Sequence, residues 1–358
     1  MKRWVLLNPG PVNVTDRVRG ALLRDDICHR EPEFAALLRS IRGKILKLFK
    51  ISGTHTVALL SGSGTAALEA MLSSFAEEGK KILVLSNGVY GDRMKTILEI
   101  HDSPVEVLRS EPGAFPEMEK IERLLKNDSS IHGIGAVHHE TSTGMLNPLA
   151  AVGALAKKYK KTFLVDAVSS LGGETVDFKK WSIDACAGSA GKCLHGLPGA
   201  SFVILSKAQA KKLRMKKPRS LYLNLSHTLA HEERDQTPFT PAVPIFYAFD
   251  EALSELLKEG LSRRIRNYAK KSALLEKGFM DLGLHFLVEK KYRSHVLTAL
   301  WTPPRVSYRA LHDSLKKAGF VIYAGQSNLE GKIFRVANLG DIREKDIRRF
   351  LVTLKKIL

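Results

Sequence analysis

Residues 164–170 read LVDAVSS, and residues 188–192 read GSAGK. The first segment is an apolar run that leads into Asp166, and the second is a turn of small residues that carries Lys192. Parallel sheets bind their ligands beyond the carboxyl ends of their strands. We therefore expect Asp166 to end a strand and to lie, with Lys192, at the functional edge of a sheet.

The pattern around these segments extends the sheet in both directions. From residue 55 to about residue 245, short apolar runs alternate with amphipathic segments, as strands and crossover helices do in an α/β protein with a mostly parallel sheet. The predicted strands are 56–60, 81–86, 133–138, 162–166, 183–187 and 201–205. The predicted helices between them are 64–79, 90–101, 115–127 and 147–159.

The length of the chain predicts more than one domain, because 358 residues exceed what one core usually organises. We expect a short N-terminal segment (1–13), a large domain (14–245) and a C-terminal part (246–358). The last would begin with a linking helix over 246–282 and continue as a small α/β domain. Its predicted strands are 284–288, 295–301, 320–323 and 333–337.

Composition points to a cytoplasmic protein. No apolar run approaches the roughly 20 residues of a membrane span, and the start, MKRWVLLNPGPV, has too short an apolar run for a signal peptide. The three cysteines, Cys28, Cys186 and Cys193, lack the paired spacing of a metal site or a disulfide framework. We expect small buried fillers, with a nucleophilic Cys193 as the less favoured alternative.

The net charge of +19 raises the alternative of a nucleic-acid binder. Its densest basic stretch, KAQAKKLRMKKPR at 207–219, has no interleaved aromatic residues for base stacking. We expect a solvated helix face there, and no nucleic-acid or membrane partner. A positive field of this kind would still attract anionic substrates.

Two glycine-bracketed turns follow predicted strands. In SGSGT, at 61–65, hydroxyls and backbone N–H groups meet the start of a helix, which is a phosphate cradle or, alternatively, an ordinary N-cap. In NGVYG, at 87–91, Tyr90 lies on a turn between two glycines, which suits a ring that stacks on a flat ligand. A half-buried tyrosine in an ordinary turn fits the same pattern equally well.

The segment HHETSTGMLNP, at 138–148, places Glu140, Thr141, Ser142 and Thr143 after another predicted strand. Its hydroxyls suit the polar edge of a ligand. The paired histidines suggest a metal, but no second ligand cluster accompanies them, so we expect polar strand-end residues and no metal.

The acid and the amine together suggest a cofactor. A pyridoxal phosphate enzyme needs a carboxylate for the pyridine nitrogen and a lysine for the aldehyde. The negative charge of a buried Asp166 would keep that nitrogen protonated. The alternatives for the two residues are a turn aspartate and one of many solvated lysines.

The order of these motifs resembles that of the class V, fold-type I aminotransferases. Within that family the chain is most similar to the 2-aminoethylphosphonate:pyruvate group, with alanine:glyoxylate and serine:pyruvate transaminases as relatives. The markers, in chain order, are LLNPGPV, SGSGT, SNGVYGDRM, HETSTGMLNP, VDAVSSLGG, GSAGKCLHGLPG, PFTPAVP, GFVIYAG and FRVANLGD.

The resemblance implies a mostly parallel seven-stranded sheet, pyridoxal 5′-phosphate as cofactor, and a homodimer with active sites at its interface. It also implies that the N-terminal segment borders the active site. Lys192 would form the Schiff base and move the proton, and Asp166 would hold the pyridine nitrogen. The implied contacts are Tyr90 and Val168 on the two ring faces, Thr141 near the 3-oxygen, Ser63, Gly64, Thr65 and the partner subunit's Thr240 on the phosphate, and Arg335 on the substrate anion.

The implied reaction moves an amino group from a small amine, 2-aminoethylphosphonate first, to pyruvate or a similar 2-oxo acid. Transfer between alanine or serine and glyoxylate or pyruvate is the alternative. A desulfurase would keep the fold, but no cysteine lies on an evident loop opposite Lys192. A non-enzymatic basic nucleic-acid binder is the remote alternative.

The chain departs from the family pattern in three places. Gly191 stands where relatives often have glutamine or asparagine, and Thr237 stands where some have a tyrosine that reaches the partner's phosphate. Both changes remove expected contacts to the cofactor. The segment ICHREPEF, at 27–34, also differs, and it bears on substrate choice.

Overall fold

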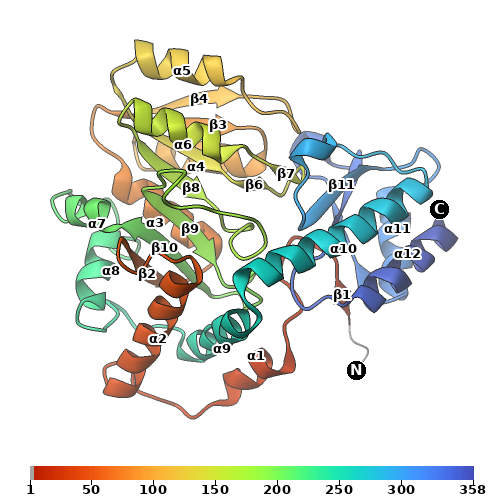
Figure 1. Cartoon of the computed structure of the whole chain (residues 1–358), viewed down its shortest axis with the longest axis horizontal. Helices are drawn as coiled ribbons and strands as arrows, with labels where there is room; N and C mark the ends of the chain where they lie inside the picture. The colour runs from red at the N-terminus through yellow and green to blue at the C-terminus, as the bar shows by residue number, and fades with distance from the viewer. Residues whose placement is uncertain (1–3) are drawn as a thin grey trace.

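A computed structural model describes residues 4–358 and contains a seven-stranded sheet with the order β2-β10-β9-β8-β5-β3-β4 (Figure 1). The predicted mostly parallel sheet is confirmed: β3, β4, β5, β8 and β9 pair in parallel, and β10 is antiparallel to β2 and β9. The strands are β2 His55–Ser61, β3 Lys81–Ser86, β4 Val105–Arg109, β5 Ile131–Val137, β8 Thr162–Asp166, β9 Ala185–Ser189 and β10 Ala200–Ser206.

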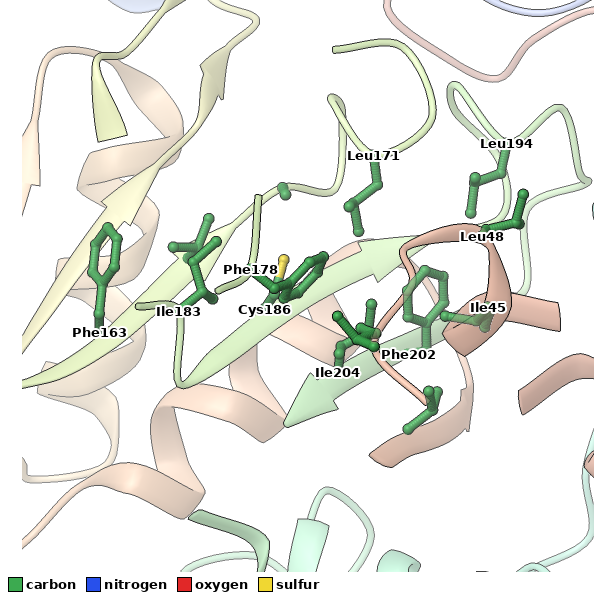
Figure 2. Packing of buried hydrophobic residues seen from close by; sticks show 14 of the residues in the cluster. Ile45, Leu48, Phe163, Leu171, Phe178, Ile183, Cys186, Leu194, Phe202 and Ile204 are labelled. Atoms are coloured by element: carbon green, nitrogen blue, oxygen red, sulfur yellow. The ribbon is translucent and has the colours of Figure 1, made fainter. Parts of the chain in front are cut away.

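Helices cover both faces of this sheet because its central strands are apolar on both sides. One buried cluster joins the sheet to α2 Pro32–Leu48, α5 Met118–Asn127, α6 Leu149–Lys158 and α9 Val243–Glu259. The opposite cluster joins it to α3 Gly64–Phe75, α4 Val89–Ile100, α7 Lys207–Leu213 and α8 Leu225–Glu232. Figure 2 shows the first cluster, where Phe202 and Ile204 of β10 lie near Ile45 and Leu48 of α2.

The sequence prediction omitted β4. This strand pairs only with β3, at the edge of the sheet, and its residues are half-buried or exposed. An edge strand does not need the continuous apolar run by which the central strands were recognised.

The linking segment is two helices rather than one. It contains α9 and α10 Leu261–Asp281, which are separated at Gly260. Gly260 has φ +87°, a conformation that interrupts a helix and that glycine adopts without steric cost. The single helix predicted over 246–282 was therefore wrong at this residue.

The C-terminal part contains a three-stranded sheet, β11-β14-β13, beside two helices (Figure 1). The elements are β11 Leu297–Trp301, α11 Tyr308–Lys317, β13 Tyr323–Ala324, β14 Ile333–Ala337 and α12 Glu344–Ile357. The strand predicted over 284–288 is reduced to an isolated bridge between Phe286 and Leu300. The domain boundaries themselves stay predictions.

The N-terminal segment joins the C-terminal part. Strand β1 Val5–Leu6 pairs in parallel with β12 Phe320–Val321, and Ala337 N–H donates to Leu7 O. After the short helix α1 Asp16–Gly20, the chain enters α2 on the large sheet. Residues 7–31 therefore connect the C-terminal part to the helix α2 that covers the large sheet.

Three smaller expectations have mixed outcomes. Cys186 and Cys193 are buried, but Cys28 is exposed, so the prediction of a buried filler there was wrong. Only Lys207–Leu213 of the basic stretch is helical, in α7. In the described residues, no helix has the length and apolar character needed to cross a bilayer.

Candidate active site

A cavity of about 170 Å³ opens at the carboxyl ends of β8 and β5 and at the start of α3. It brings together most of the residues predicted for the site. The predicted residues that line the cavity are Ser63, Gly64, Thr65, Tyr90, Thr141, Asp166, Val168 and Lys192. Larger hollows, of about 620 and 860 Å³, lie elsewhere, and neither contains Asp166 or Lys192.

Asp166 ends β8 and is buried beneath the cavity, with 5% of its surface exposed. Its Oδ1 accepts a hydrogen bond from Val168 N–H at 2.9 Å. Burial raises the pKa of this carboxyl to about 6, because the low-dielectric surroundings disfavour its charge. The charges of Arg93 and Lys192 oppose that rise. A cationic group that binds next to Asp166 would stabilise the charged form of this carboxyl.

Lys192 follows β9 on a tight turn that contains Gly191. Burial lowers the pKa of its amine to about 8, so that a larger fraction is neutral near neutral pH than in an exposed lysine. A neutral amine is what a nucleophile or a general base requires. The reactive amine and the buried acid therefore share one cavity, as their motifs predicted.

The N-terminal segment crosses the amine. Lys192 Nζ donates a hydrogen bond to Pro9 O, and Gly10, with φ +121°, lies beside the same nitrogen. A Cβ at residue 10 would lie 2.4 Å from Lys192 Nζ. Residues 9 and 10 thus form part of the wall around the amine.

The start of α3 forms one wall of the cavity. Ser63 is the N-cap residue, and its side chain makes no capping hydrogen bond in the described chain, which leaves the hydroxyl available to a ligand. The alternative, in which the Ser63 side chain caps the helix in the ordinary way, is therefore not observed. Gly64 comes next, and a Cβ there would lie 2.5 Å from Val168 Cγ1. Glycine allows the helix start to approach Val168 this closely.

That close approach predicts a loss of stability in Gly64→Ala. The added methyl group must displace Val168 or the start of α3, and overpacking of this kind costs about 1–3 kcal/mol. Urea denaturation measures the change in the free energy of unfolding. Gly53→Ala is the matched control, since no described atom lies within 4 Å of a Cβ at residue 53. Equal stability of the two variants would contradict the tight contact.

Tyr90 lines the cavity from the first turn of α4, and Glu140 fixes that turn. The buried Glu140 accepts hydrogen bonds from the N–H groups of Tyr90 (3.1 Å) and Gly91 (3.2 Å). Ser142 also bonds to this carboxylate, and Thr143 Oγ1 donates to Glu140 O. Of the predicted row of ligand hydroxyls, only Thr141 lines this cavity; Ser142 and Thr143 line the separate hollow of about 620 Å³.

The paired histidines are neutral and hydrogen-bonded. His138 Nδ1 lies 2.9 Å from Ser170 Oγ, and His139 Nε2 lies 2.8 Å from Ser294 Oγ. Burial lowers the pKa of each to about 3. In residues 4–358, no group of three or more His, Cys, Asp or Glu side chains is placed to hold a metal ion.

Arg335, on β14, lies behind Thr141 and not in the cavity lining. Its Nη1 donates to Thr141 O at 2.8 Å and to Gln326 Oε1 at 3.1 Å, and its Nε donates to Ala324 O at 2.8 Å. It is 1% exposed, yet its charge contributes to the lowered pKa of Lys192. The guanidinium is thus a desolvated cation near the amine.

The remaining predicted positions lie apart from the cavity or contribute no side chain. Thr240 is exposed and borders a separate hollow beside Pro241. Thr237 is buried, and its hydroxyl has no hydrogen-bond partner in the described residues. Gly191 is buried, and a Cβ there would lie 3.2 Å from Pro198 N.

Four further residues line the cavity and were not predicted for it: Leu68, Arg93, His139 and Ser169. Arg93 had a signal in the sequence. It follows Tyr90 by three residues in a predicted helix, a spacing that puts both side chains on one face. Leu68 follows Thr65 by the same three-residue spacing on α3, His139 precedes Glu140, and Ser169 follows Val168.

Comparisons with known proteins identify the family of the chain. The model of the class-V aminotransferases matches residues 16–340. A 2-aminoethylphosphonate–pyruvate transaminase of Bacillus cereus is 35% identical, over 99% of this chain and 97% of that protein. One from Bacillus anthracis has the same identity and coverage.

Solved structures give the same result. An alanine–glyoxylate aminotransferase from Nostoc superimposes with a TM-score of 0.94 at 28% identity, over 100% of this chain and 96% of that one. A pyridoxamine–pyruvate aminotransferase from Mesorhizobium loti superimposes with a TM-score of 0.92 at 25% identity, over 100% and 92%. By its sequence, its fold and its full-length similarity to these enzymes, the chain belongs to the class-V aminotransferase family.

Proposed function

We propose that the protein is a pyridoxal 5′-phosphate-dependent transaminase that moves an amino group from 2-aminoethylphosphonate to pyruvate or a similar 2-oxo acid. The observation that carries the chemistry is the shared cavity of Asp166 and Lys192. The full-length similarity to 2-aminoethylphosphonate–pyruvate transaminases supports the donor.

The residues of the cavity fit this cofactor. A helix start with a free Ser63 hydroxyl suits a phosphate, and a buried acid suits a protonated ring nitrogen. Tyr90 and Val168 supply surfaces for the two ring faces, and Thr141 supplies a hydroxyl near the ring edge. When bound, pyridoxal phosphate supplies the electron-withdrawing ring that amino transfer requires.

The chain's own residues would divide the remaining work. Lys192 Nζ would bind the aldehyde carbon, and once released it would take a proton from the donor's amine-bearing carbon and deliver it to the cofactor carbon that had carried the aldehyde. Its lowered pKa suits both tasks. Asp166 would keep its charge beside the ring nitrogen, and residues 9 and 10 would limit the access of water to the amine.

Arg335 would hold the donor's anionic group. A guanidinium matches the geometry of carboxylate and phosphonate alike. For this reason transfer between alanine or serine and glyoxylate or pyruvate is the second candidate, supported by the similarity to the alanine–glyoxylate aminotransferase of Nostoc.

The visible spectrum of the cofactor-loaded protein distinguishes these donors. We expect 2-aminoethylphosphonate, added without an acceptor, to bleach the absorption band of the bound aldehyde form. Bleaching by alanine or serine but not by the phosphonate would assign the second candidate. A protein that never takes up the colour would contradict the transaminase proposal.

Arg335→Lys should impair the use of the donor while cofactor binding persists. Lysine keeps the positive charge but lacks the planar guanidinium, so it cannot form the paired hydrogen bonds to an anionic group. Because one charge-assisted hydrogen bond contributes about 1.5–3 kcal/mol, kcat/KM should fall about 10²-fold. Steady-state kinetics and the visible spectrum measure the two effects. Arg349→Lys, on α12, is a control that should leave both unchanged. Unchanged kcat/KM in Arg335→Lys, or a fall in kcat/KM that comes only from loss of the cofactor colour, would contradict the assignment.

The proposal includes a cytoplasmic homodimer in which Thr240 reaches the partner's phosphate. Two observations support this role: Thr240 is exposed, and it lies outside the cavity of its own chain. Tyr222 and Phe239, whose rings stack at 5.1 Å, form an aromatic surface beside it. Sedimentation of the protein with Thr240→Ala and Tyr222→Ala would test the assembly.

A further inference from the structure

Arg93 is a cation of the cavity to which the proposed reaction assigns no task. It lies one helical turn after Tyr90 on α4, and its Cζ stands 4.6 Å from the centroid of the Tyr90 ring. Its Nη1 donates to Thr65 Oγ1 at 3.2 Å. The side chain therefore spans from the ring surface to the start of α3.

The guanidinium of Arg93 has no carboxylate partner. Its described contacts are the Thr65 hydroxyl and the Tyr90 ring, and no ion pair within 4.0 Å joins it to an acid in residues 4–358. Arg93 is only half-buried, but it faces a cavity and not open solvent. A partly desolvated charge without a counter-ion is unfavourable, so the site is more stable when an anion occupies it.

Arg335 is in the same condition, since its described hydrogen bonds all go to neutral oxygens. The cavity and its rear wall thus contain two arginines that form no ion pair within 4.0 Å in residues 4–358, although the charge of Glu140 acts on Arg335 from a greater distance. Asp166 feels the charge of Arg93, but that carboxyl lies outside ion-pairing distance. Two guanidinium groups without ion pairs would be stabilised by a ligand, or a pair of ligands, that carries two anionic groups.

The place of Arg93 identifies which anion it meets. Thr65 lies in the first turn of α3, where unpaired backbone N–H groups and the helix dipole favour a negative charge. A guanidinium that bonds to the hydroxyl of this turn presents its remaining N–H groups at the same point. Planar arginine forks bind tetrahedral phosphate oxygens by paired hydrogen bonds. Arg335, by contrast, is fixed to the carbonyl of Thr141.

We propose that Arg93 is a ligand of the cofactor's 5′-phosphate, acting from α4 together with the start of α3. This inference rests on the proposed function, because it takes pyridoxal phosphate as the occupant. It assigns Arg93 to cofactor retention and leaves Arg335 for the substrate's anion. Because Arg93 contacts both Thr65 and Tyr90, one side chain would reach the phosphate and also support the ring that stacks on the cofactor.

A comparison of pyridoxal phosphate with pyridoxal tests the proposal. The two compounds differ only in the phosphate, so a phosphate ligand affects the affinity of one and not of the other. We expect Arg93→Gln to weaken pyridoxal phosphate binding about 10- to 100-fold and to change pyridoxal binding less than about 3-fold. Arg93→Lys should give an intermediate loss, because it keeps the charge without the fork. Equilibrium dialysis of the cofactor-free protein measures both dissociation constants.

Arg109→Gln is the matched control. Arg109 ends the neighbouring strand β4, pairs with Asp92 and lies outside the cavity, so its removal changes the net charge equally without touching the site. It should leave both affinities unchanged. Circular dichroism confirms that each variant is folded.

Other outcomes overturn the inference in distinguishable ways. If Arg93→Gln weakens both compounds equally, Arg93 supports the Tyr90 ring and does not bind phosphate. Unchanged affinity for both compounds would remove Arg93 from the site. Wild-type protein that binds neither compound would contradict the proposed function itself, and the role of Arg93 with it.

Discussion

Lys192→Ala should abolish amino transfer while the protein remains folded. The amine is the only group in the described cavity with a pKa lowered to about 8, and no other lysine lines it. Losing both the covalent attachment and the proton transfer should lower kcat by about 10⁴-fold or more. A coupled assay of 2-oxo acid consumption measures the loss.

Two controls separate chemistry from charge. Lys211→Ala removes an exposed lysine of α7 and should retain full activity. The purified Lys192→Ala protein should also lose cofactor on gel filtration, whereas the Lys211→Ala protein should keep it. Measurable turnover by Lys192→Ala would show that another group performs the proton transfer.

Asp166→Asn should give the second largest loss. Asparagine keeps the shape of the side chain and can accept the hydrogen bond from Val168, but it carries no charge. Without that charge the ring nitrogen is not held protonated. We expect kcat to fall about 10³-fold, comparable to the removal of one pre-organised electrostatic group. Asp184→Asn is the control, since Asp184 accepts from Phe163 at the opposite end of β8.

The same substitution predicts a pH-dependent change in the stability of the cofactor-free protein. The pKa of Asp166 is raised to about 6, against about 3.9 in an unfolded chain. Below about pH 4 both states are protonated, and above about pH 6 the folded state contains an unfavourable charge. Stability from this residue is therefore lost as the pH rises from about 4 to 6, by about 3 kcal/mol at most.

Asp166→Asn should remove that loss. Relative to the wild type, the variant should gain up to about 3 kcal/mol between about pH 4 and about pH 7, as measured by urea denaturation. A pH-independent difference between the two proteins would mean that the carboxylate is not destabilised by burial. At neutral pH, Asp166→Asn should therefore have a lower kcat than the wild type, while its cofactor-free form should have a higher free energy of unfolding.

The central sheet could be predicted from the sequence because its strands are buried on both faces. Short apolar runs such as Phe163–Val165, bounded by polar residues and alternating with amphipathic segments, favour strands that are buried on both faces of a sheet. The edge strand β4 and the bend at Gly260 could not be predicted in the same way. The first is half-exposed, and the second depends on a backbone angle that a glycine permits but does not require.

The site shows a similar division. Asp166 and Lys192 could be identified because Asp166 ends β8 and Lys192 follows β9, each in a short, distinctive motif. The role of Glu140 depends on the direction of its side chain toward the start of α4, which no spacing in the chain specifies, whereas the three-residue spacing of Tyr90 and Arg93 does put those two side chains on one helix face. The hydrogen bond from the Ser142 hydroxyl to Glu140 could not be predicted for the same reason.

Reduction of the cofactor-loaded protein with borohydride, followed by peptide mass spectrometry, tests the central claim most directly. Borohydride makes the bond between the cofactor's aldehyde carbon and a lysine permanent, so the modified residue can be identified. We predict one pyridoxyl group per chain, on the peptide that contains Lys192. Modification of a different lysine, or no modification at all, would contradict the account of this site.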